Sequence, residues 1–436
     1  MEGHPVTAVR HDTRYEYSTL LLLGAGFGLV GFDRWLMAPL FPHMMRDLNL
    51  SYSELGSLIG VIGVTWGLWS VLMGPLADRV GRKKILVATM VTFSALSCLS
   101  GFATGFISLL LLRGAMGIAE GTFTPASIAA NSEASHPSRR GLNLGLQISM
   151  VPLMGLGFAP IVATQLLQWV PNWHWVFALS AIPGFIVAFS IWRCIHDRAP
   201  TIAEVSGHKK PQRWLDLFSS RNVAVATVAI LCAMGGIFVI GAMVPTYLVE
   251  VIQLDGRSMG FVASAVGFGG FIGCFTLPGL SDYIGRRPTA LVGFVCAAIL
   301  LCLFSRVGAN PVLLFVLLFG VALFAMGLLS LFSGPVATEA APLGLIASTI
   351  GFVSGVGETF GGGVAPVIAG FVAQNYGIAK TLDFALYSLL LGVIVSCFLA
   401  ETAPRRRKSG AVLDERSDRL GAPAVGAGGP IKAGND

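Results

Sequence analysis

Long apolar stretches recur along the whole chain, separated by short segments that are charged or rich in turn residues. Dividing the chain at these breaks gives about twelve stretches of roughly 20 residues or more, the length that a helix needs to cross a bilayer. They cover residues 18–42, 54–77, 84–103, 106–130, 141–168, 174–193, 222–250, 257–280, 288–305, 311–338, 344–372 and 380–400. The pattern predicts an all-α polytopic membrane protein with twelve transmembrane helices.

The amino-acid composition supports this prediction. Hydrophobic residues make up 54% of the chain and charged residues 12%, whereas a soluble protein carries roughly a quarter charged residues. The first apolar stretch is too long for the core of a signal peptide and lacks a small-residue cleavage site, so we expect a retained helix. The seven cysteines show neither metal spacing nor a disulfide pattern, and we interpret them as packing residues.

The basic residues lie mostly on one side of the predicted topology. If both termini are in the cytoplasm, 23 of the 29 lysines and arginines fall on the cytoplasmic side and four in outer loops. The positive-inside rule requires this asymmetry. It accounts for the net charge of +6, so no nucleic-acid partner is needed. The two remaining basic residues, Arg34 and Arg113, lie within apolar stretches.

The two halves of the chain resemble each other. "GPLADRVGRKK" (74–84) returns as "GLSDYIGRR" (279–287), and "GLGFAP" (155–160) returns as "GGGVAP" (361–366), with offsets of 204 and 206 residues. Two motifs that share nearly one offset indicate an internal duplication. We expect an N-terminal tail, a six-helix bundle, a cytoplasmic linker, a second six-helix bundle and a disordered cytoplasmic tail, at residues 1–17, 18–193, 194–221, 222–402 and 403–436.

Residues 74–84 resemble the loop signature of the major facilitator superfamily, Gly-x-x-x-Asp-Arg-x-Gly-Arg-Lys-x. The resemblance extends over residues 18–402 and implies two pseudo-symmetric six-helix bundles around a cavity that opens alternately to each side. Charges at the cytoplasmic loops could then latch one bundle to the other in one state; the simpler alternative is that they only fix topology. The candidate latch residues are Asp78, Arg79, Arg82, Asp282 and Arg286.

A narrower resemblance is carried by four shorter motifs. They are similar to the anion:cation symporter branch, which includes carriers of sugar acids, hexuronates, other organic acids and vesicular glutamate. The motifs are "FDR" (32–34), "RGAMGIAEGTFTPA" (113–126), "RRGLNLG" (139–145) and "VPTYLVE" (244–250). The resemblance implies that the chain moves a small organic anion together with protons.

Three acidic residues, Asp33, Glu120 and Glu358, lie deep within the predicted spans. A charge near the bilayer centre is costly unless it faces a partner or a wet cavity. Asp33 and Arg34 are helix neighbours and point about 100° apart, so each needs its own partner. Arg113 and Glu120 lie two turns apart on one face, roughly 10 Å along the axis. The alternative is a permanent ion network that only specifies helix packing.

Glu120 is the first candidate for the coupling proton, because a carboxyl group away from water can exchange a proton near neutral pH. The glutamate of the resembled "Gly-Ile-x-Glu-Gly" motif is associated with proton coupling in that branch. Asp33 is the second candidate, and Arg113 is expected to organise the proton pathway.

Arg34 is the best candidate for binding substrate, because its planar fork fits a carboxylate bidentately. The alternative is an arginine that stays locked to a protein carboxylate. Glu358 departs from the resembled branch, which usually has a neutral polar residue there. It could bind a second proton, accept hydrogen bonds from substrate hydroxyls, favour a cationic substrate group or stay protonated. Further candidates for the cavity lining, each equally consistent with packing, are Gln147, Trp66, Trp69 and Tyr247.

The leading hypothesis is proton-coupled symport of a small carboxylate, sugar acid or aromatic acid, by a monomer in a bacterial inner membrane. One rival is a proton antiporter that exports an amphiphilic compound, and another is a membrane sensor or scaffold that binds ligand without moving it. No nucleophile–base constellation or nucleotide loop is recognisable, so neither an enzyme nor an ATP-driven pump is expected. The only implied partners besides the anion are protons and lipids, with no metal and no other cofactor.

Overall fold

The computed structural model describes residues 12–136, 139–196, 220–341 and 346–402, and within these ranges the regular structure is entirely helical. Each of the twelve predicted spans coincides with one helix or with a run of consecutive helices. Ten of the described helices are long and apolar enough to cross a membrane. The chain is therefore an all-α polytopic membrane protein, as its apolar pattern predicts.

The first half of the chain forms six spans, and the fifth is interrupted by a π-helical segment, η1. The elements are α1 (Thr13–Leu48), α2 (Tyr52–Val80), α3 (Arg82–Ser100), α4 (Phe106–Ala134), α5 (Arg140–Val151), η1 (Pro152–Phe158), α6 (Ala159–Leu166) and α7 (Trp173–Cys194).

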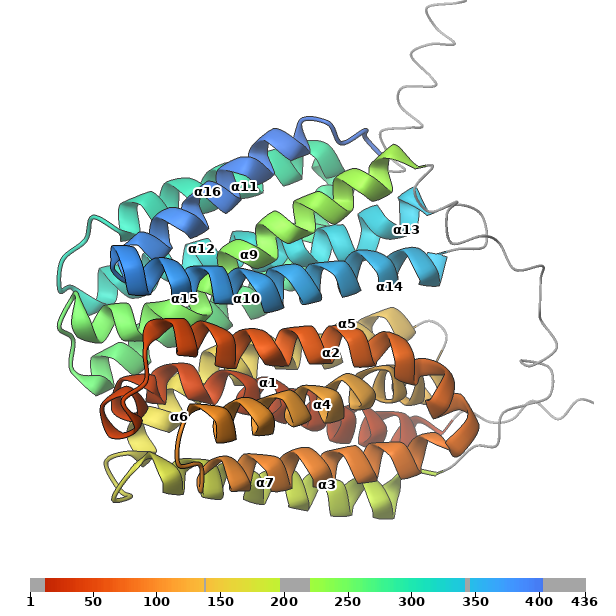
Figure 1. The fold of residues 1–436 in the computed structure, drawn as a ribbon. Helices are drawn as coiled ribbons and strands as arrows, with labels where there is room; N and C mark the ends of the chain where they lie inside the picture. The colour runs from red at the N-terminus through yellow and green to blue at the C-terminus, as the bar shows by residue number, and fades with distance from the viewer. Residues whose placement is uncertain (1–11, 137–138, 197–219, 342–345, 403–436) are drawn as a thin grey trace, which may run out of the picture.

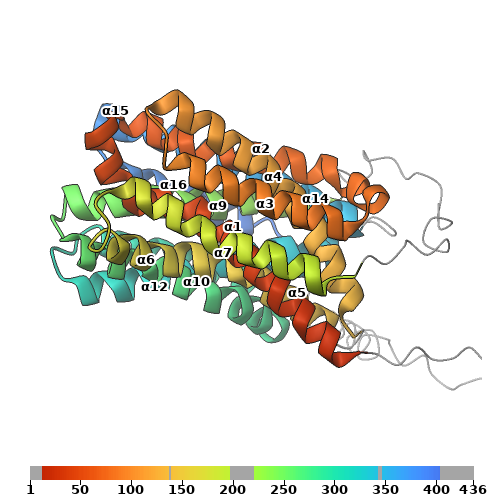
Figure 2. The ribbon, with the colours of Figure 1, turned by 90° about the horizontal axis from the view of Figure 1, so that it is seen from below.

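The second half repeats this order with two interrupted spans. The elements are α9 (Arg221–Glu250), α10 (Gly256–Ile284), α11 (Arg286–Phe304), α12 (Pro311–Leu331), η3 (Phe332–Val336), α13 (Ala337–Ala340), α14 (Ile346–Val356), η4 (Gly357–Val364), α15 (Ala365–Tyr376) and α16 (Lys380–Ser396). Figure 1 shows the two halves one above the other, and Figure 2 shows that helices of both halves run in a similar direction.

The duplication seen in the sequence is present in the backbone. The second and third spans, α2 and α3, have the same lengths as α10 and α11, which lie 204 residues later. Gly81 and Gly285 join the members of each pair with φ values of 100° and 111°, a conformation that residues with a Cβ avoid. The π segments η1 and η4 also occupy matching positions. Similar sequence motifs in the two halves therefore form the same local backbone structure.

Glycines bring the two halves into backbone contact. Gly63 on α2 lies against Gly362 in η4, and Gly157 in η1 lies against Gly267 on α10. Helices in a membrane associate through close packing rather than through the hydrophobic effect, and small residues allow this close approach. Each of the two glycine clusters that the sequence repeats, at 155–157 and 361–363, thus contributes glycines to a surface where the halves meet: Gly157 in the first, and Gly362 and Gly363 in the second.

We predict that Gly267→Ala destabilises the protein. A Cβ at this position would lie 1.8 Å from the backbone nitrogen of Gly157, and overpacking of this kind costs about 1–3 kcal/mol. Thermal unfolding in detergent should show a lower Tm. Gly279→Ala on the same helix is the matched control, because a Cβ there meets nothing within 4 Å. Equal Tm values for the two variants would contradict the described contact.

Candidate functional site

Two of the buried charges meet between the two halves of the molecule. The Arg34 guanidinium on α1 forms an ion pair through Nη2 with Oε1 of Glu358 in η4, and the two side chains are 6% and 8% exposed. The centre of the guanidinium lies 5.1 Å from the ring of Phe238 on α9 and 5.8 Å from that of Trp35. Arg34 is therefore neutralised by a protein carboxylate and flanked by two aromatic rings. π segments such as η4 often occur at functional sites.

Asp33 faces the other way, into the first half. Its Oδ1 accepts a hydrogen bond of 2.9 Å from Ser97 Oγ on α3, and Ser97 Oγ lies 3.1 Å from Ser180 Oγ on α7. The expectation that Asp33 and Arg34 find separate partners on other helices is thus met in the structure. Hydroxyl donors satisfy a buried carboxylate without adding a charge.

Arg113 ties α4 to the backbone of this pair. Its Nη1 donates to the carbonyl oxygens of Asp33 and Arg34 at 3.1 and 3.2 Å, and the guanidinium lies 5.7 Å from the ring of Phe177. The side chain is fully buried, and its Nε and Nη2 have no hydrogen-bond partner among the described residues. Arg113 thus positions the two charged residues of α1 and adds a second positive charge beside them.

Glu120 is the least satisfied charged group of the site. It is fully buried, and neither carboxylate oxygen has a hydrogen-bond partner within the described ranges. The charged groups that act on it are Arg34, Asp33, Arg113 and Glu358. A buried polar group without a partner costs free energy, so Glu120 is an uncompensated carboxyl group that interacts with four other charged side chains.

Gln147 belongs to a polar network inside the first half and is not hydrogen-bonded to Arg34 or Glu358. Its Nε2 donates to Ser127 Oγ at 2.5 Å, and its Oε1 accepts from Asn131 Nδ2 at 2.7 Å. Helices α4 and α5 are joined by these contacts. The prediction that Gln147 contacts substrate stays untested, but in this conformation its amide is already used by protein groups.

The same network contains an acid that sequence reasoning missed. Glu16 is fully buried; it accepts from Asn143 Nδ2 and from Arg139 Nη2, both at 2.7 Å. The apolar pattern begins the first predicted span at residue 18, which places Glu16 in the predicted N-terminal tail. Asp12 was the available signal, since it caps α1 through the amides of Arg14 and Tyr15. An aspartate followed by a first-turn glutamate marks a helix start.

The aromatic candidates lie at different places. Tyr247 is buried in the apolar core with its ring 6.3 Å from that of Phe304, and it lies nine residues beyond Phe238, roughly 13 Å along the helix axis. Trp66 is half-buried on α2, and its backbone lies against Gly121, the neighbour of Glu120. Trp69 is also half-buried. The structure thus puts Trp66 near the site and Tyr247 away from the Arg34–Glu358 pair.

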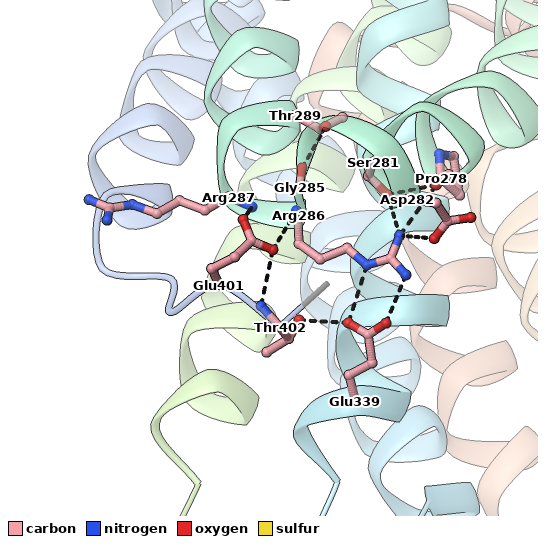
Figure 3. A network of polar contacts seen from close by, with 10 residues as sticks. All are labelled: Pro278, Ser281, Asp282, Gly285, Arg286, Arg287, Thr289, Glu339, Glu401 and Thr402. Atoms are coloured by element: carbon pink, nitrogen blue, oxygen red, sulfur yellow. Dashed lines mark hydrogen bonds and ion pairs between the residues drawn. The ribbon is translucent and has the colours of Figure 1, made fainter. Parts of the chain in front are cut away.

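The loop charges of the second half form a compact network (Figure 3). Arg286 pairs with Asp282 and Glu339, both at 2.7 Å, and donates to Ser281 Oγ. Glu401 accepts from the backbone nitrogen of Arg286 at 2.8 Å, at the start of α11. A carboxylate at a helix N-terminus satisfies free amides and favours the helix dipole. The chain that follows α16 is thereby tied back to α11.

A matching ion pair joins Arg82 to Glu133 in the first half. Each of these described pairs connects helices of the same half, so in this conformation none of them latches one half to the other. The side chains of Asp78 and Arg79 lie outside the described part of the structure. A latch role for the five residues in another conformation stays a prediction.

The two helical halves of this membrane protein thus meet at a buried ion pair, an arrangement that suits a membrane transporter. The chain belongs to the Major Facilitator Superfamily, whose family model matches residues 23–357 and 227–426. The resemblance read from residues 74–84 is confirmed by this match.

Several curated transporters are similar to this chain. A probable 4-methylmuconolactone transporter of Cupriavidus pinatubonensis is 29% identical over 388 residues, covering 87% of this chain and 89% of that protein. The hexuronate transporter of Bacillus subtilis is 29% identical over 340 residues, covering 75% and 74%. A D-galactonate transporter of Escherichia coli is 23% identical over 424 residues, covering 89% and 96%.

Solved structures confirm the fold. A bacterial homologue of the human lysosomal transporter Spinster, in an inward-facing and unoccupied conformation, has a TM-score of 0.69 at 17% identity and covers 89% of this chain and 97% of its own. A mutant of the nucleoside transporter NupG has a TM-score of 0.74 at 12% identity, with coverages of 88% and 99%.

We predict that Glu339→Gln lowers the Tm more than Glu133→Gln does. Arg286 is only 4% exposed, whereas Arg82 and Glu133 are 25% and 36% exposed. Loss of a partner from a buried charge is far more costly than loss from an exposed one. Because Asp282 remains beside Arg286, we expect a loss on the order of 1–3 kcal/mol. Thermal unfolding of both variants in one detergent measures the difference, and a larger loss for Glu133→Gln would reverse the assignment.

Proposed function

We propose that this transporter is a symporter that moves a small organic anion together with protons by alternating access. The observation that carries the proposal is a guanidinium, Arg34, enclosed between the two halves with only a protein carboxylate as its counter-ion. A buried arginine of this kind suits a carboxylate cargo, because it offers charge and a planar fork of donors. The curated relatives named as carriers of acids support the same cargo class.

Glu120 is proposed to carry the coupling proton. When it gains a proton, the buried site becomes more positive by one charge, and an anion on Arg34 is then favoured in a low-dielectric surrounding. When the proton leaves on the other side, the anion is repelled by the restored carboxylate. Asp33 is proposed as the alternative site for this proton, and Arg113 holds the backbone of Asp33 and Arg34 in place. Cargo and proton thus favour each other's binding.

The surroundings of Arg34 favour a cargo with a flat or apolar body. Its guanidinium contacts the rings of Phe238 and Trp35, which lie 5.4 Å apart at a T-shaped angle. Such rings pack well against a lactone or an aromatic acid, whereas a polyhydroxylated sugar acid needs many hydrogen-bond partners. We therefore propose a lactone or aromatic carboxylate as the preferred cargo and sugar acids as the second choice. The proposed setting is a bacterial inner membrane, with both termini in the cytoplasm and a monomer as the functional unit.

Proteoliposomes test this function directly. With 4-methylmuconolactone and D-galactonate as labelled probes, an inward proton gradient of one pH unit should drive accumulation of about tenfold for each coupled proton. Uncoupled vesicles should only equilibrate the probe, and Arg34→Gln should neither bind nor transport it. Accumulation driven by an outward-directed proton gradient instead would identify an antiporter, and binding of a probe without any flux would identify a sensor.

Glu120→Gln is predicted to abolish gradient-driven accumulation while exchange of labelled for unlabelled probe continues. The amide cannot exchange a proton, but it preserves the shape of the side chain and leaves Arg34 in place. Accumulation and exchange are measured in the same vesicles. Asp383→Asn, at an exposed carboxylate on α16, is the control and should keep both activities. Unchanged accumulation in Glu120→Gln would remove this residue from the coupling role.

A further inference from the structure

We propose that Glu358 is an internal counter-anion that the cargo must replace on Arg34, and that this replacement adds one proton to every transport cycle. The inference rests on the proposed symport of an organic anion. Glu358 is thereby assigned the role of a second proton-binding site, which is one of the roles that the sequence left open. The number of protons moved with each cargo molecule then depends on this one side chain.

The first step of the argument is the occupancy of Arg34. Its guanidinium is paired with Glu358 and is flanked by Phe238 and Trp35, with only 6% of the side chain exposed. Its Nε makes no hydrogen bond within the described part of the chain. The fork therefore retains an unused donor for a carboxylate, but its charge is already neutralised. An arriving anion therefore meets no net positive charge at Arg34 until a proton neutralises the Glu358 carboxylate.

The second step is the identity of the groups that face Glu358. Arg34 of α1 is its described ion-pair partner, and Glu120 of α4 interacts with it electrostatically. The elements packed against η4 are α2, α9, α14 and α15. The charged side chains described on these four elements, Glu54, Arg221 and Glu250, lie at helix ends, away from the centre of the membrane. Among the described residues Glu358 forms its ion pair with Arg34, whereas the other arginine of the site, Arg113, donates to the backbone carbonyls of Asp33 and Arg34.

The third step is a count of charge. The site holds two arginines and three carboxyl groups, so its fully ionised charge is one negative unit. Protons on Glu120 and Glu358 make it one positive unit, and a monoanionic cargo then brings it to zero. With an amide at position 358 the ionised site is already neutral, and a single proton on Glu120 suffices for the same cargo. The carboxyl group of Glu358 therefore accounts for the additional proton.

This arrangement also couples cargo to the contact between the halves. The Arg34–Glu358 pair is the described ion pair that links the two halves. A proton on Glu358 without cargo leaves Arg34 buried and without a counter-ion, which is unfavourable. Cargo without the proton leaves two carboxylates facing one arginine. When cargo and the proton on Glu358 arrive together, the Arg34–Glu358 ion pair separates without a change in the net charge of the site, so proton leak is disfavoured.

The test compares wild-type protein with Glu358→Gln in proteoliposomes, with 4-methylmuconolactone as the probe because it is a monocarboxylate at neutral pH. Proton and probe fluxes are recorded together with a pH-sensitive dye and a radiolabel. We expect two protons per probe in the wild type and one in Glu358→Gln. A negative-inside potential set with potassium and valinomycin should accelerate uptake several-fold in the wild type and leave Glu358→Gln unaffected. Asp383→Asn serves as the control and should match the wild type.

Equal ratios and equal responses to the potential in the two proteins would overturn the proposal. A failure of the underlying symport function would look different, since no proton gradient would then drive the probe in any variant. If Glu358→Gln does not fold, calorimetry of wild-type protein in two buffers of different ionisation enthalpy gives an independent readout. Uptake of two protons per bound probe supports the proposal, and uptake of one contradicts it.

Discussion

The structure depends on one constraint, which is that every charge removed from water inside a membrane bundle needs a partner. Desolvation makes an isolated charge in hydrocarbon costly, and the chain meets this requirement with three different kinds of contact. Arg34 pairs with a carboxylate of the other half, Asp33 accepts from hydroxyl groups, and Arg113 donates to backbone carbonyls. Of the five charged side chains of the site, Glu120 alone has neither an ion pair nor a side-chain hydrogen bond within the described residues. The other four charged residues of the site each have an ion-pair or hydrogen-bond partner.

The backbone makes these contacts possible. Glycines between the halves, such as Gly63 and Gly362 near Glu358, allow the helices to approach closely enough for an ion pair to bridge them. The π segment η4 holds Glu358 at this boundary, and its counterpart η1 lies at the other boundary, against α10. Duplication therefore supplied two similar surfaces. Of the two segments, η4 carries a carboxylate and η1 carries none, which gives an asymmetric site within a nearly symmetric scaffold.

Much of the fold could be predicted from the sequence, because bilayer thickness dictates the length of apolar spans and the repeat dictates their order. The depth of Asp33, Arg34, Arg113, Glu120 and Glu358 followed from the same spans. Which of these side chains pair did not follow, since the choice between Glu120 and Glu358 as the partner of Arg34 depends on helix rotation and on the contact between distant helices. Tyr247 shows the same limit. The sequence places it in the seventh span, but its distance from Arg34 depends on how α1 and α9 pack against each other.

The partnership of Arg34 with Glu358 has a consequence for biogenesis. Spans enter the membrane in the order of their synthesis, so α1 must be inserted long before the ribosome reaches the eleventh span. During that interval Arg34 has no access to its final counter-ion, and the adjacent Asp33 is the nearest opposite charge on the nascent helix. Ser97 and Arg113 are synthesised next and donate hydrogen bonds to the side chain and the backbone carbonyl of Asp33. Arg34 still lacks its ion-pair partner at this stage. Glu358 is the last of the three site carboxylates to be translated, and a truncated chain that stops before it would expose an unpaired cation to the quality-control machinery of the membrane.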